Sequence, residues 1–258
     1  MEIKQLTGIF GARITDIDLS QPLEDATISA LSSALKQYKV LVFPEQHSLT
    51  PEKHLALAKR FGRVEIPHPT WPDYPGSPGL KVLTLKGTEK KKGQARDGWH
   101  TDGSTRENTA WISLLQAIEI PPYGRDTMFA DMEAVYAGLS SPMQSFLEGL
   151  TAEHSWGWQK PEAPPVEHPV VMRDPASGRK WLYVNRSYTT RIIGLTEREN
   201  NCVLQFLFEQ AHIPECQLRV SWQPRALAMW DNEITQHYII QDGVFPRVMH
   251  RAMVSPMR

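Results

Sequence analysis

The stretch Gly98-Trp99-His100-Thr101-Asp102 places an imidazole and a carboxylate two residues apart. Along an extended backbone, alternate side chains point to the same face, so His100 and Asp102 can reach one small cation from a single strand end. Two ligands do not complete a metal site. A third ligand must come from another part of the chain, and the fold has to bring the two parts together.

A second polar stretch, Trp230 to Tyr238, contains His237. Two histidines and one carboxylate on one face of an octahedral ion leave three positions open, which suits ferrous iron that binds a bidentate cosubstrate and O2. Zinc is more often held in a closed tetrahedral set or with one open position. His100, Asp102 and His237 are therefore the candidate metal ligands, with a zinc hydrolase as the alternative interpretation.

Two arginines, Arg247 and Arg251, lie shortly after His237. Arginine is the preferred partner of a carboxylate, because its planar guanidinium donates two parallel charge-assisted hydrogen bonds. On a strand, residues 247, 249 and 251 share a face. We therefore expect both arginines to point into the cavity that holds the metal, and His250 to face away from it.

The composition excludes several classes of protein. The chain has 258 residues, of which 41% are hydrophobic and 22% charged, as is ordinary for a globular protein with a substantial core. A net charge of −1 without a long basic block gives no indication of nucleic acid or an anionic membrane as partner. Cys202 and Cys216 are the only cysteines, too few for a disulfide framework. With no apolar signal core or membrane span, we expect a cytoplasmic protein.

Many short apolar or alternating runs predict strands, and fewer amphipathic runs predict helices. The predicted strands are residues 3–7, 12–17, 40–43, 80–85, 109–118, 126–130, 217–222, 226–230 and 248–254, with a hairpin of 168–171 and 180–184. The predicted helices follow residue 25, begin at Pro51 after the N-cap Thr50, occupy 134–150 as two short pieces, and run over 196–211 behind a capping box of Thr196 and Glu199. This pattern favours an α+β fold built on a β-sandwich.

Two proline-rich loops, residues 64–98 and 157–168, interrupt this pattern. The first ends in a basic segment, Lys86 to Arg96, directly before the metal motif. A long loop next to a site can act as a lid, although a solvated tip is the simpler interpretation of the lysines. We expect one domain over residues 1–258, with both loops bordering the active site.

Beyond these patterns, the chain resembles the TauD/TfdA family of Fe(II)- and 2-oxoglutarate-dependent dioxygenases over nearly its whole length. The resemblance includes these segments: Val40 to Phe43 followed by the Leu49 to Gly62 helix, Trp99 to Asp102, Gly124 to Thr127, Asn185 to Ile192, and Trp230 to Arg251. The resemblance implies a double-stranded β-helix (jelly roll) core with flanking helices. It also implies Fe(II), 2-oxoglutarate and O2 as cofactor and cosubstrates.

The resemblance also assigns roles by matched position. His100, Asp102 and His237 correspond to the iron ligands, and Thr127 and Arg247 to the residues that hold the distal carboxylate of 2-oxoglutarate. The substrate-contacting positions correspond to Arg251, His68, Trp71, Arg96 and Trp156. Three of these depart from the taurine enzyme, which has Tyr, Asn and Phe where this chain has Trp71, Arg96 and Trp156. We therefore do not expect taurine itself to be the substrate.

By this resemblance, the chain hydroxylates a C–H bond of a small-to-medium anionic organic substrate and releases succinate and CO2. A sulfonate, a sulfate ester, a carboxylate or an aryloxyalkanoate would fit the buried arginine and the tryptophans. Asp102 favours hydroxylation, because related halogenases have a small residue there. The alternatives are a biosynthetic tailoring oxygenase (desaturation or ring formation) and, less favoured, a non-catalytic jelly-roll binding protein. Relatives suggest a homo-oligomer, a dimer or a tetramer, by analogy.

Several candidate residues have a simpler interpretation. Arg96 is also explained as a solvated loop arginine, and Trp71 and Trp156 as aromatics of the core or its rim. Asp231-Asn232 has the composition of a turn that positions the strand carrying His237 through hydrogen bonds.

Overall fold

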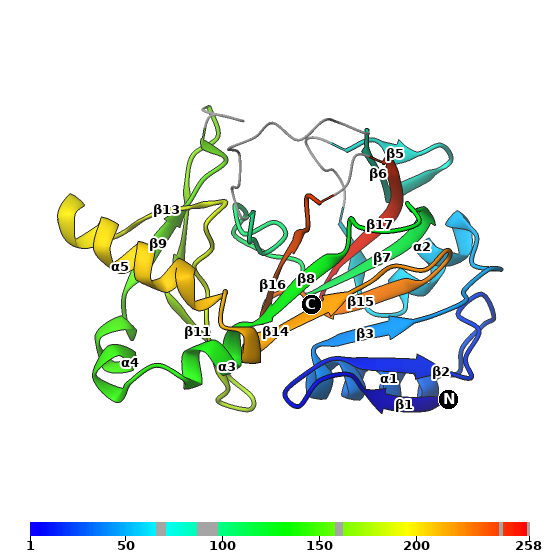
Figure 1. Cartoon of the computed structure of the whole chain (residues 1–258), viewed down its shortest axis with the longest axis horizontal. Coiled ribbons are helices and arrows are strands. Elements are labelled where there is room, and N and C mark those ends of the chain that lie inside the picture. Colours follow the sequence, from blue (N-terminus) through cyan, green and yellow to red (C-terminus); the bar gives the residue numbers. More distant parts are fainter. Residues whose placement is uncertain (66–70, 87–97, 158–161, 243–244, 257–258) are drawn as a thin grey trace.

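A large and a small β-sheet form the centre of the molecule (Figure 1). The structure is a computed structural model and describes residues 1–65, 71–86, 98–157, 162–242 and 245–256. The large sheet has nine strands. Its order is β1 (Glu2–Gln5), β2 (Ala12–Thr15), β3 (Val40–Phe43), β15 (Leu227–Asp231), β7 (Ile112–Glu119), β17 (Arg247–Ser255), β6 (Ser77–Leu85) and β5 (Asp73–Tyr74), with β4 (Arg63–Val64) paired to β17.

The small sheet has the order β14 (Gln217–Val220), β8 (Thr127–Asp131) and β16 (Thr235–Ile239), and both pairs are antiparallel. Side chains from the two sheets form one buried cluster, in which the rings of Phe129 and Trp230 meet edge to face at 5.4 Å. Each sheet buries one face against the other, as a sandwich requires. The α+β jelly-roll core expected from the sequence is thus confirmed.

Two helices cover the outer face of the large sheet, α1 (Asp25–Tyr38) and α2 (Pro51–Lys59). Helix α1 buries Ile28, Leu31 and Leu35, which follow the helical repeat. Helix α2 begins as predicted, because the Thr50 side chain accepts a hydrogen bond from the Lys53 backbone N–H and proline follows the cap.

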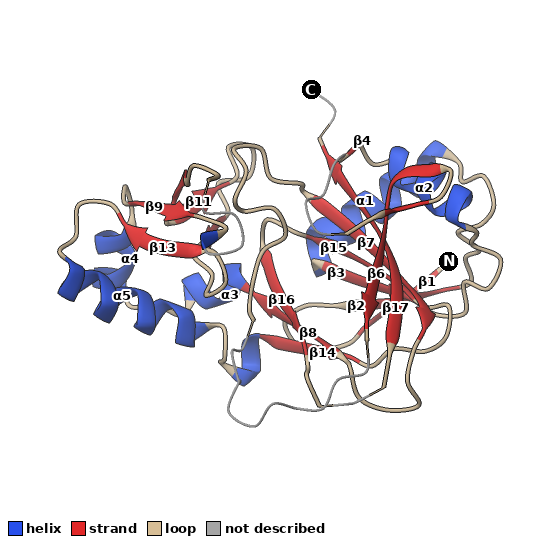
Figure 2. Ribbon diagram, turned by 90° about the horizontal axis from the view of Figure 1, so that it is seen from above, coloured by secondary structure: helices blue, strands red, loops and turns tan. Residues whose placement is uncertain are grey.

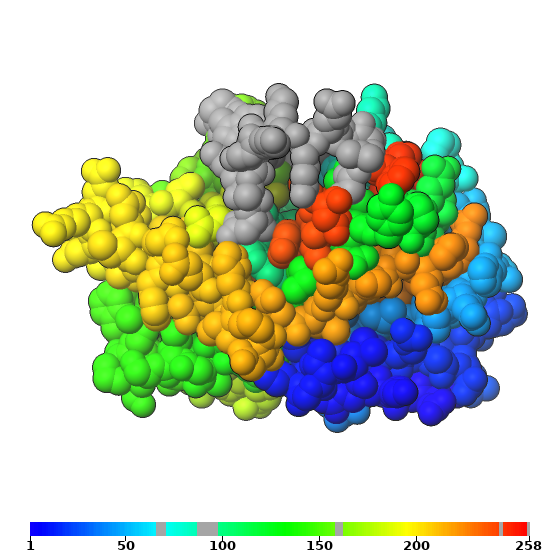
Figure 3. Space-filling model, in the orientation of Figure 1, coloured from blue at the N-terminus to red at the C-terminus, as the bar shows by residue number. Residues whose placement is uncertain are grey.

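The remaining elements form a second lobe, which projects to one side of the sandwich (Figures 2 and 3). It consists of α3 (Met132–Ala137), α4 (Ser141–Leu147), a sheet of β10 (Val166–Pro169), β9 (Thr151–His154) and β13 (Thr189–Ile192), the hairpin of β11 (Val171–Arg173) and β12 (Lys180–Leu182), α5 (Glu197–Gln210) and the 3₁₀ turn η2 (Pro214–Cys216). The capping box of Thr196 and Glu199 starts α5, as predicted. Trp99 belongs to the hydrophobic core of this lobe.

The second lobe is also where the strand predictions are wrong in detail. The predicted hairpin pairs only residues 171–173 with 180–182. His168 and Pro169 pair instead with Ala152 and Thr151 of β9, a strand that the sequence pattern did not predict. Strands β9 and β13 have only four residues each, too few to show a reliable alternation, so their pairing depends on tertiary contacts.

Among the described residues, no helix combines the length and the apolar character that crossing a membrane requires.

Candidate active site

The two candidate histidine ligands lie directly opposite each other on adjacent backbone segments. The His100 N–H donates to the His237 carbonyl oxygen at 3.1 Å, and the His237 N–H donates to the His100 carbonyl oxygen at 2.9 Å. This reciprocal pair brings the imidazole rings to a centroid distance of 4.4 Å. One ligand atom from each of His100, Asp102 and His237 lies within 4.8 Å of the others, so the three side chains can hold one metal ion.

The orientation of the rings suits metal binding. His100 Nδ1 lies 2.7 Å from the Gly98 carbonyl oxygen, which can only accept a hydrogen bond, so Nδ1 carries the proton and the lone pair is on Nε2. The two Nε2 atoms lie 3.7 and 3.8 Å from the Asp102 carboxylate oxygens. Burial, and next the charge of His100, lower the pKa of His237 to about 3. His237 is therefore neutral at pH 7, as a metal ligand has to be.

Asp102 remains ionised despite its burial. Burial by itself would raise the pKa of this carboxyl, but Arg251 and, to a lesser extent, His237 hold it well below its usual range. Arg251 Nη1 donates to Asp102 Oδ1 at 2.6 Å, and the Ser113 hydroxyl donates to Oδ2 at 3.3 Å. The carboxylate is thus fixed in direction and kept available as an anionic oxygen ligand.

Asn232 connects the two stretches that carry the ligands. Its side chain is fully buried; Oδ1 accepts from the Asp102 N–H at 3.1 Å, and Nδ2 donates to the carbonyl oxygens of Asp102 and Ala110, each at 2.8 Å. Asp231 Oδ1 accepts from the backbone N–H groups of Glu233 and Ile234. The turn predicted at Asp231-Asn232 therefore exists, and it fixes β16 relative to the 98–102 stretch.

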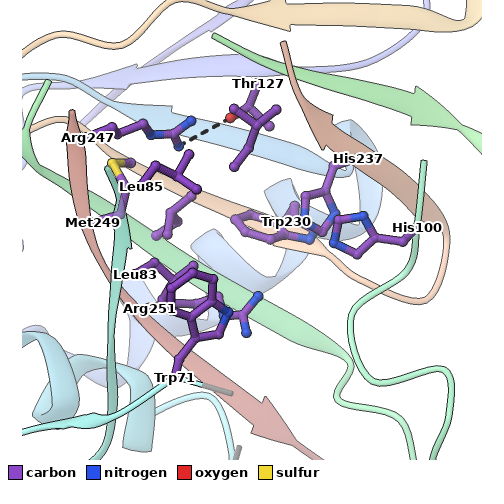
Figure 4. Close-up of a pocket in the computed structure, with 12 residues that line it drawn as sticks. Trp71, Leu83, Leu85, His100, Thr127, Trp230, His237, Arg247, Met249 and Arg251 are labelled. Atoms are coloured by element: carbon purple, nitrogen blue, oxygen red, sulfur yellow. Dashed lines mark hydrogen bonds between the residues drawn. The ribbon is translucent and has the colours of Figure 1, made fainter. Parts of the chain in front are cut away.

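A cavity of about 170 Å³ opens beside the histidines (Figure 4). Arg247 and Thr127 lie at one end of it, and Arg251 and Trp71 at the other, with His100 and His237 on the wall between. Both arginines thus share the cavity, as strand periodicity predicted. The other lining residues are Leu83, Leu85, Leu115, Trp230, Ile239 and Met249.

Arg247, at one end of the cavity, is almost completely buried: 1% of the surface of this residue is exposed. Nη1 donates to the Arg125 carbonyl oxygen at 2.8 Å and Nη2 to the Thr127 hydroxyl at 3.4 Å, while Nε has no hydrogen-bond partner among the residues that the structure describes. Burial lowers the pKa of Arg247 to about 10, an effect that Asp126 opposes and Arg125 adds to. The guanidinium therefore stays charged at pH 7.

The Arg251 end differs in its partner. Within the described part of the chain, Nη1 of Arg251 binds Asp102, and the buried Nε and Nη2 atoms have no hydrogen-bond partner. These two atoms leave donor capacity next to the metal ligands, which is where an anionic group could be bound.

The structure does not bring all the predicted substrate residues to the cavity. His68 and Arg96 lie outside the described residues, as does most of the basic segment before the metal motif. Trp156 is not among the lining residues; its ring meets Tyr188 edge to face at 5.3 Å, and Tyr188 lies 6.1 Å from the His100 ring. His250 faces away from the cavity, as expected, and contacts Tyr74.

Sequence reasoning missed the apolar wall of the cavity and one polar contact. Leu83 and Leu85 alternate on β6 as Arg247, Met249 and Arg251 do on β17, so pairing the two strands in register would have found them. The polar contact is that of the Trp222 indole with Thr127, which no local pattern indicates.

The chain is similar to a known family and to several known proteins. Residues 2–253 match the family model described as taurine catabolism dioxygenase TauD, TfdA family. An alkylsulfatase of Acinetobacter baylyi is 31% identical, covering 99% of this chain and 85% of that protein. An alpha-ketoglutarate-dependent 2,4-dichlorophenoxyacetate dioxygenase of Cupriavidus pinatubonensis is also 31% identical, covering 90% of this chain and 89% of that protein.

Among solved structures, a putative alpha-ketoglutarate-dependent taurine dioxygenase from Burkholderia xenovorans superposes with a TM-score of 0.88 and 34% identity. The match covers 99% of this chain and 89% of that one.

Proposed function

Because this chain belongs to the TauD/TfdA family of Fe(II)- and 2-oxoglutarate-dependent dioxygenases, we propose that it hydroxylates a C–H bond of a small-to-medium anionic organic substrate. Succinate and CO2 are the co-products. The observation that carries this proposal is the position of the His100, Asp102 and His237 ligand set beside a cavity with a buried arginine at each end.

The residues present fit Fe(II). Two neutral imidazole nitrogens and one carboxylate suit this ion and leave further coordination positions for other ligands. Bound iron, together with 2-oxoglutarate and O2, supplies the oxidation of the C–H bond. The chain's own contribution is to fix the ligand directions through Gly98, Asn232 and Arg251.

For the cosubstrate, we assign the distal carboxylate of 2-oxoglutarate to Arg247 and Thr127. Arg247 is buried, charged and without a carboxylate hydrogen-bond partner among the described residues, so a ligand carboxylate would offset the cost of its burial. The cavity between this end and the histidines is lined by apolar side chains, which exclude water.

For the substrate, we assign the anionic group to Arg251 and an apolar or aromatic remainder to Trp71 and its neighbours. Arg251 Nε and Nη2 supply the donors, and Leu83 and Met249 extend the apolar wall. The named relatives act on a sulfate ester and an aryloxyacetate, both of which combine an anion with an apolar group. His68, Arg96 and Trp156 remain proposed contacts of the substrate.

We extend the proposal to the domain organisation, the cellular location and the assembly of the protein. We take residues 1–258 as one domain in which the 64–98 and 157–168 segments, which include β5, β6 and the start of β10, border the active site. Cytoplasmic location is supported by two cysteines that form no disulfide with each other. A homo-oligomer, dimer or tetramer, follows only from analogy with relatives.

The test is a screen for succinate release with alkyl sulfates, alkanesulfonates and aryloxyalkanoates, using wild type and Arg251→Ala. We expect succinate release coupled to one of these classes in the wild type and none in the variant, with 2-oxoglutarate still bound. An unchanged substrate affinity in Arg251→Ala would refute the assignment. Because Arg251 also contacts Asp102, the metal content of each sample is measured alongside.

Product analysis separates hydroxylation from the alternative of a tailoring oxygenase. Hydroxylation adds one oxygen or releases the anionic group from the hydroxylated carbon. Desaturation or ring formation instead gives a product two hydrogens lighter than the substrate.

A further inference from the structure

Trp222 lies two residues after the end of strand β14, beside the residues assigned to the cosubstrate carboxylate. Strand β14 pairs with β8, and Val220 is opposite Thr127. Two residues close to Trp222 in the chain bind Asp126, the residue before Thr127. Arg219 Nε and the Ser221 hydroxyl both donate to the Asp126 carboxylate, at 2.7 and 2.9 Å. This segment therefore fixes the start of β8 through side chains as well as through strand pairing.

Trp222 itself makes two contacts of different kinds. Its indole Nε1–H donates to the Thr127 hydroxyl at 3.0 Å. Its ring faces the Arg247 guanidinium, whose carbon lies 5.2 Å from the ring centroid, within the range of a cation–π interaction. One side chain thus contacts both residues assigned to the distal carboxylate.

The hydrogen bonds at Thr127 determine which way its hydroxyl donates. A hydroxyl has one proton and two acceptor lone pairs. Thr127 accepts from Trp222 Nε1 and from Arg247 Nη2, so both lone pairs are in use. The Thr127 proton is therefore left to be donated to another acceptor, and Thr127 lines the cavity in which a carboxylate would lie.

The contacts of Arg247 also favour binding of an anion in the cavity. Its hydrogen-bond acceptors in the described segments, the Arg125 carbonyl and the Thr127 hydroxyl, are neutral. The electron-rich face of Trp222 stabilises the buried charge without neutralising it, and it fixes the plane of the guanidinium. The charge of Arg247 remains available to an anion in the cavity.

We propose that Trp222 is a positioning residue for the distal carboxylate of 2-oxoglutarate: its indole N–H commits Thr127 to donate, and its ring orients Arg247. This inference rests on the proposed cosubstrate assignment of Thr127 and Arg247. It assigns Trp222 no contact with the metal or with the reacting atoms.

The test compares two oxo acids that differ at one end. Both 2-oxoglutarate and pyruvate carry the 2-oxo acid group that chelates the metal, but pyruvate lacks the distal carboxylate. Anaerobic calorimetry on the full chain loaded with Mn(II) gives the Kd of each acid without turnover. Trp222→Phe keeps an aromatic ring and loses the N–H, while Trp222→Leu loses both.

For Trp222→Phe we expect the Kd of 2-oxoglutarate to rise about 3- to 10-fold, as for the loss of one hydrogen bond. Trp222→Leu should raise it further, about 10- to 50-fold, since the cation–π contact is lost as well. The Kd of pyruvate should stay unchanged in both. Trp181→Phe is the matched control, because the buried Trp181 Nε1 lies in the second lobe and has no hydrogen-bond partner in the described ranges of the chain.

Equal weakening of both acids, or no weakening in Trp222→Phe relative to Trp181→Phe, would overturn the proposal. If Trp222→Leu does not fold, the comparison of Trp222→Phe with Trp181→Phe still tests the proposal. Arg247→Met distinguishes a wrong role for Trp222 from a wrong cosubstrate assignment. If Arg247→Met weakens 2-oxoglutarate but Trp222→Phe does not, only the role of Trp222 is wrong. If neither does, the cosubstrate assignment itself fails.

Discussion

Two arginines four residues apart on β17 lie at opposite ends of one cavity, and their partners differ. Arg247 contacts a carbonyl oxygen, a hydroxyl and an indole face, all neutral, whereas Arg251 forms an ion pair with the metal ligand Asp102. The positive charge at the Arg247 end is thus left for a ligand. At the Arg251 end the charge is shared between Asp102 and the anion that we propose binds there, so we expect substrate binding and metal geometry to be linked.

The largest expected effect tests the independence of the Arg247 end. Arg247→Met removes charged hydrogen bonds, so the affinity for 2-oxoglutarate should fall about 100-fold. The affinity for Mn(II) should stay unchanged, because Arg247 contacts none of the metal ligands through a hydrogen bond. Calorimetric titration with each ligand measures both values. Loss of metal affinity in Arg247→Met would show that the two ends are not separate.

The link between the metal and its supporting turn is tested next. Asn232→Ala removes three hydrogen bonds that hold the backbone at Asp102 and Ala110. Loss of such a supporting contact typically lowers metal affinity by about 10- to 100-fold. Asn200→Ala is the control, because Asn200 is also buried and accepts from the Ile192 N–H, but in the second lobe. Equal metal affinities in the two variants would contradict the prediction.

A buried histidine on the outer face of the large sheet, His54 of α2, should make the stability of the protein depend on pH. Burial, and next the charge of His250, lower the pKa of His54 from 6.5 to about 3. Between these values the unfolded chain binds a proton that the folded protein does not, so the free energy of unfolding falls as the pH falls. His54 alone contributes about 1.4 kcal/mol per pH unit in this range.

His54→Leu should therefore flatten the loss of stability between pH 6.5 and 4.5, as measured by urea unfolding of the metal-free protein. The Kd of 2-oxoglutarate should not change, because His54 belongs to α2 on the outer face of the large sheet. Parallel pH curves for wild type and His54→Leu would show that His54 does not titrate as its burial implies.

The smallest effect concerns the second contact of Asp102. The Ser113 hydroxyl donates to Oδ2 at 3.3 Å, a longer bond than the 2.6 Å from Arg251 to Oδ1. Ser113→Ala should therefore weaken Mn(II) binding only about 2- to 5-fold. A loss as large as that of Asn232→Ala would mean that Ser113, rather than Arg251, fixes the carboxylate.

Features that depend on residues close together in the sequence can be predicted from it, and features that depend on distant residues cannot. The start of α2 at Thr50-Pro51 and the capping box of α5 depend on residues a few positions apart, and both are confirmed. Strands β9 and β13 were missed because four residues carry too little alternation. The basic segment before the metal motif, a candidate lid, lies largely outside the described residues.

For the site, the sequence by itself determined the kinds of side chain and their local spacing. His100 and Asp102 are two residues apart, and Arg247 and Arg251 share a face of β17, because strand geometry alternates side chains with a fixed period. These facts, together with the family resemblance, were enough to indicate iron, 2-oxoglutarate and an anionic substrate.

Only the tertiary structure decided how these residues act on one another. The His100–His237 pair, the Asn232 contacts and the Trp222–Thr127 hydrogen bond join residues about a hundred or more positions apart. No local period encodes such contacts, because they depend on how the two sheets and the second lobe pack. The donor state of Thr127, the ionisation of Asp102 and the difference between the two arginines all arise from that packing.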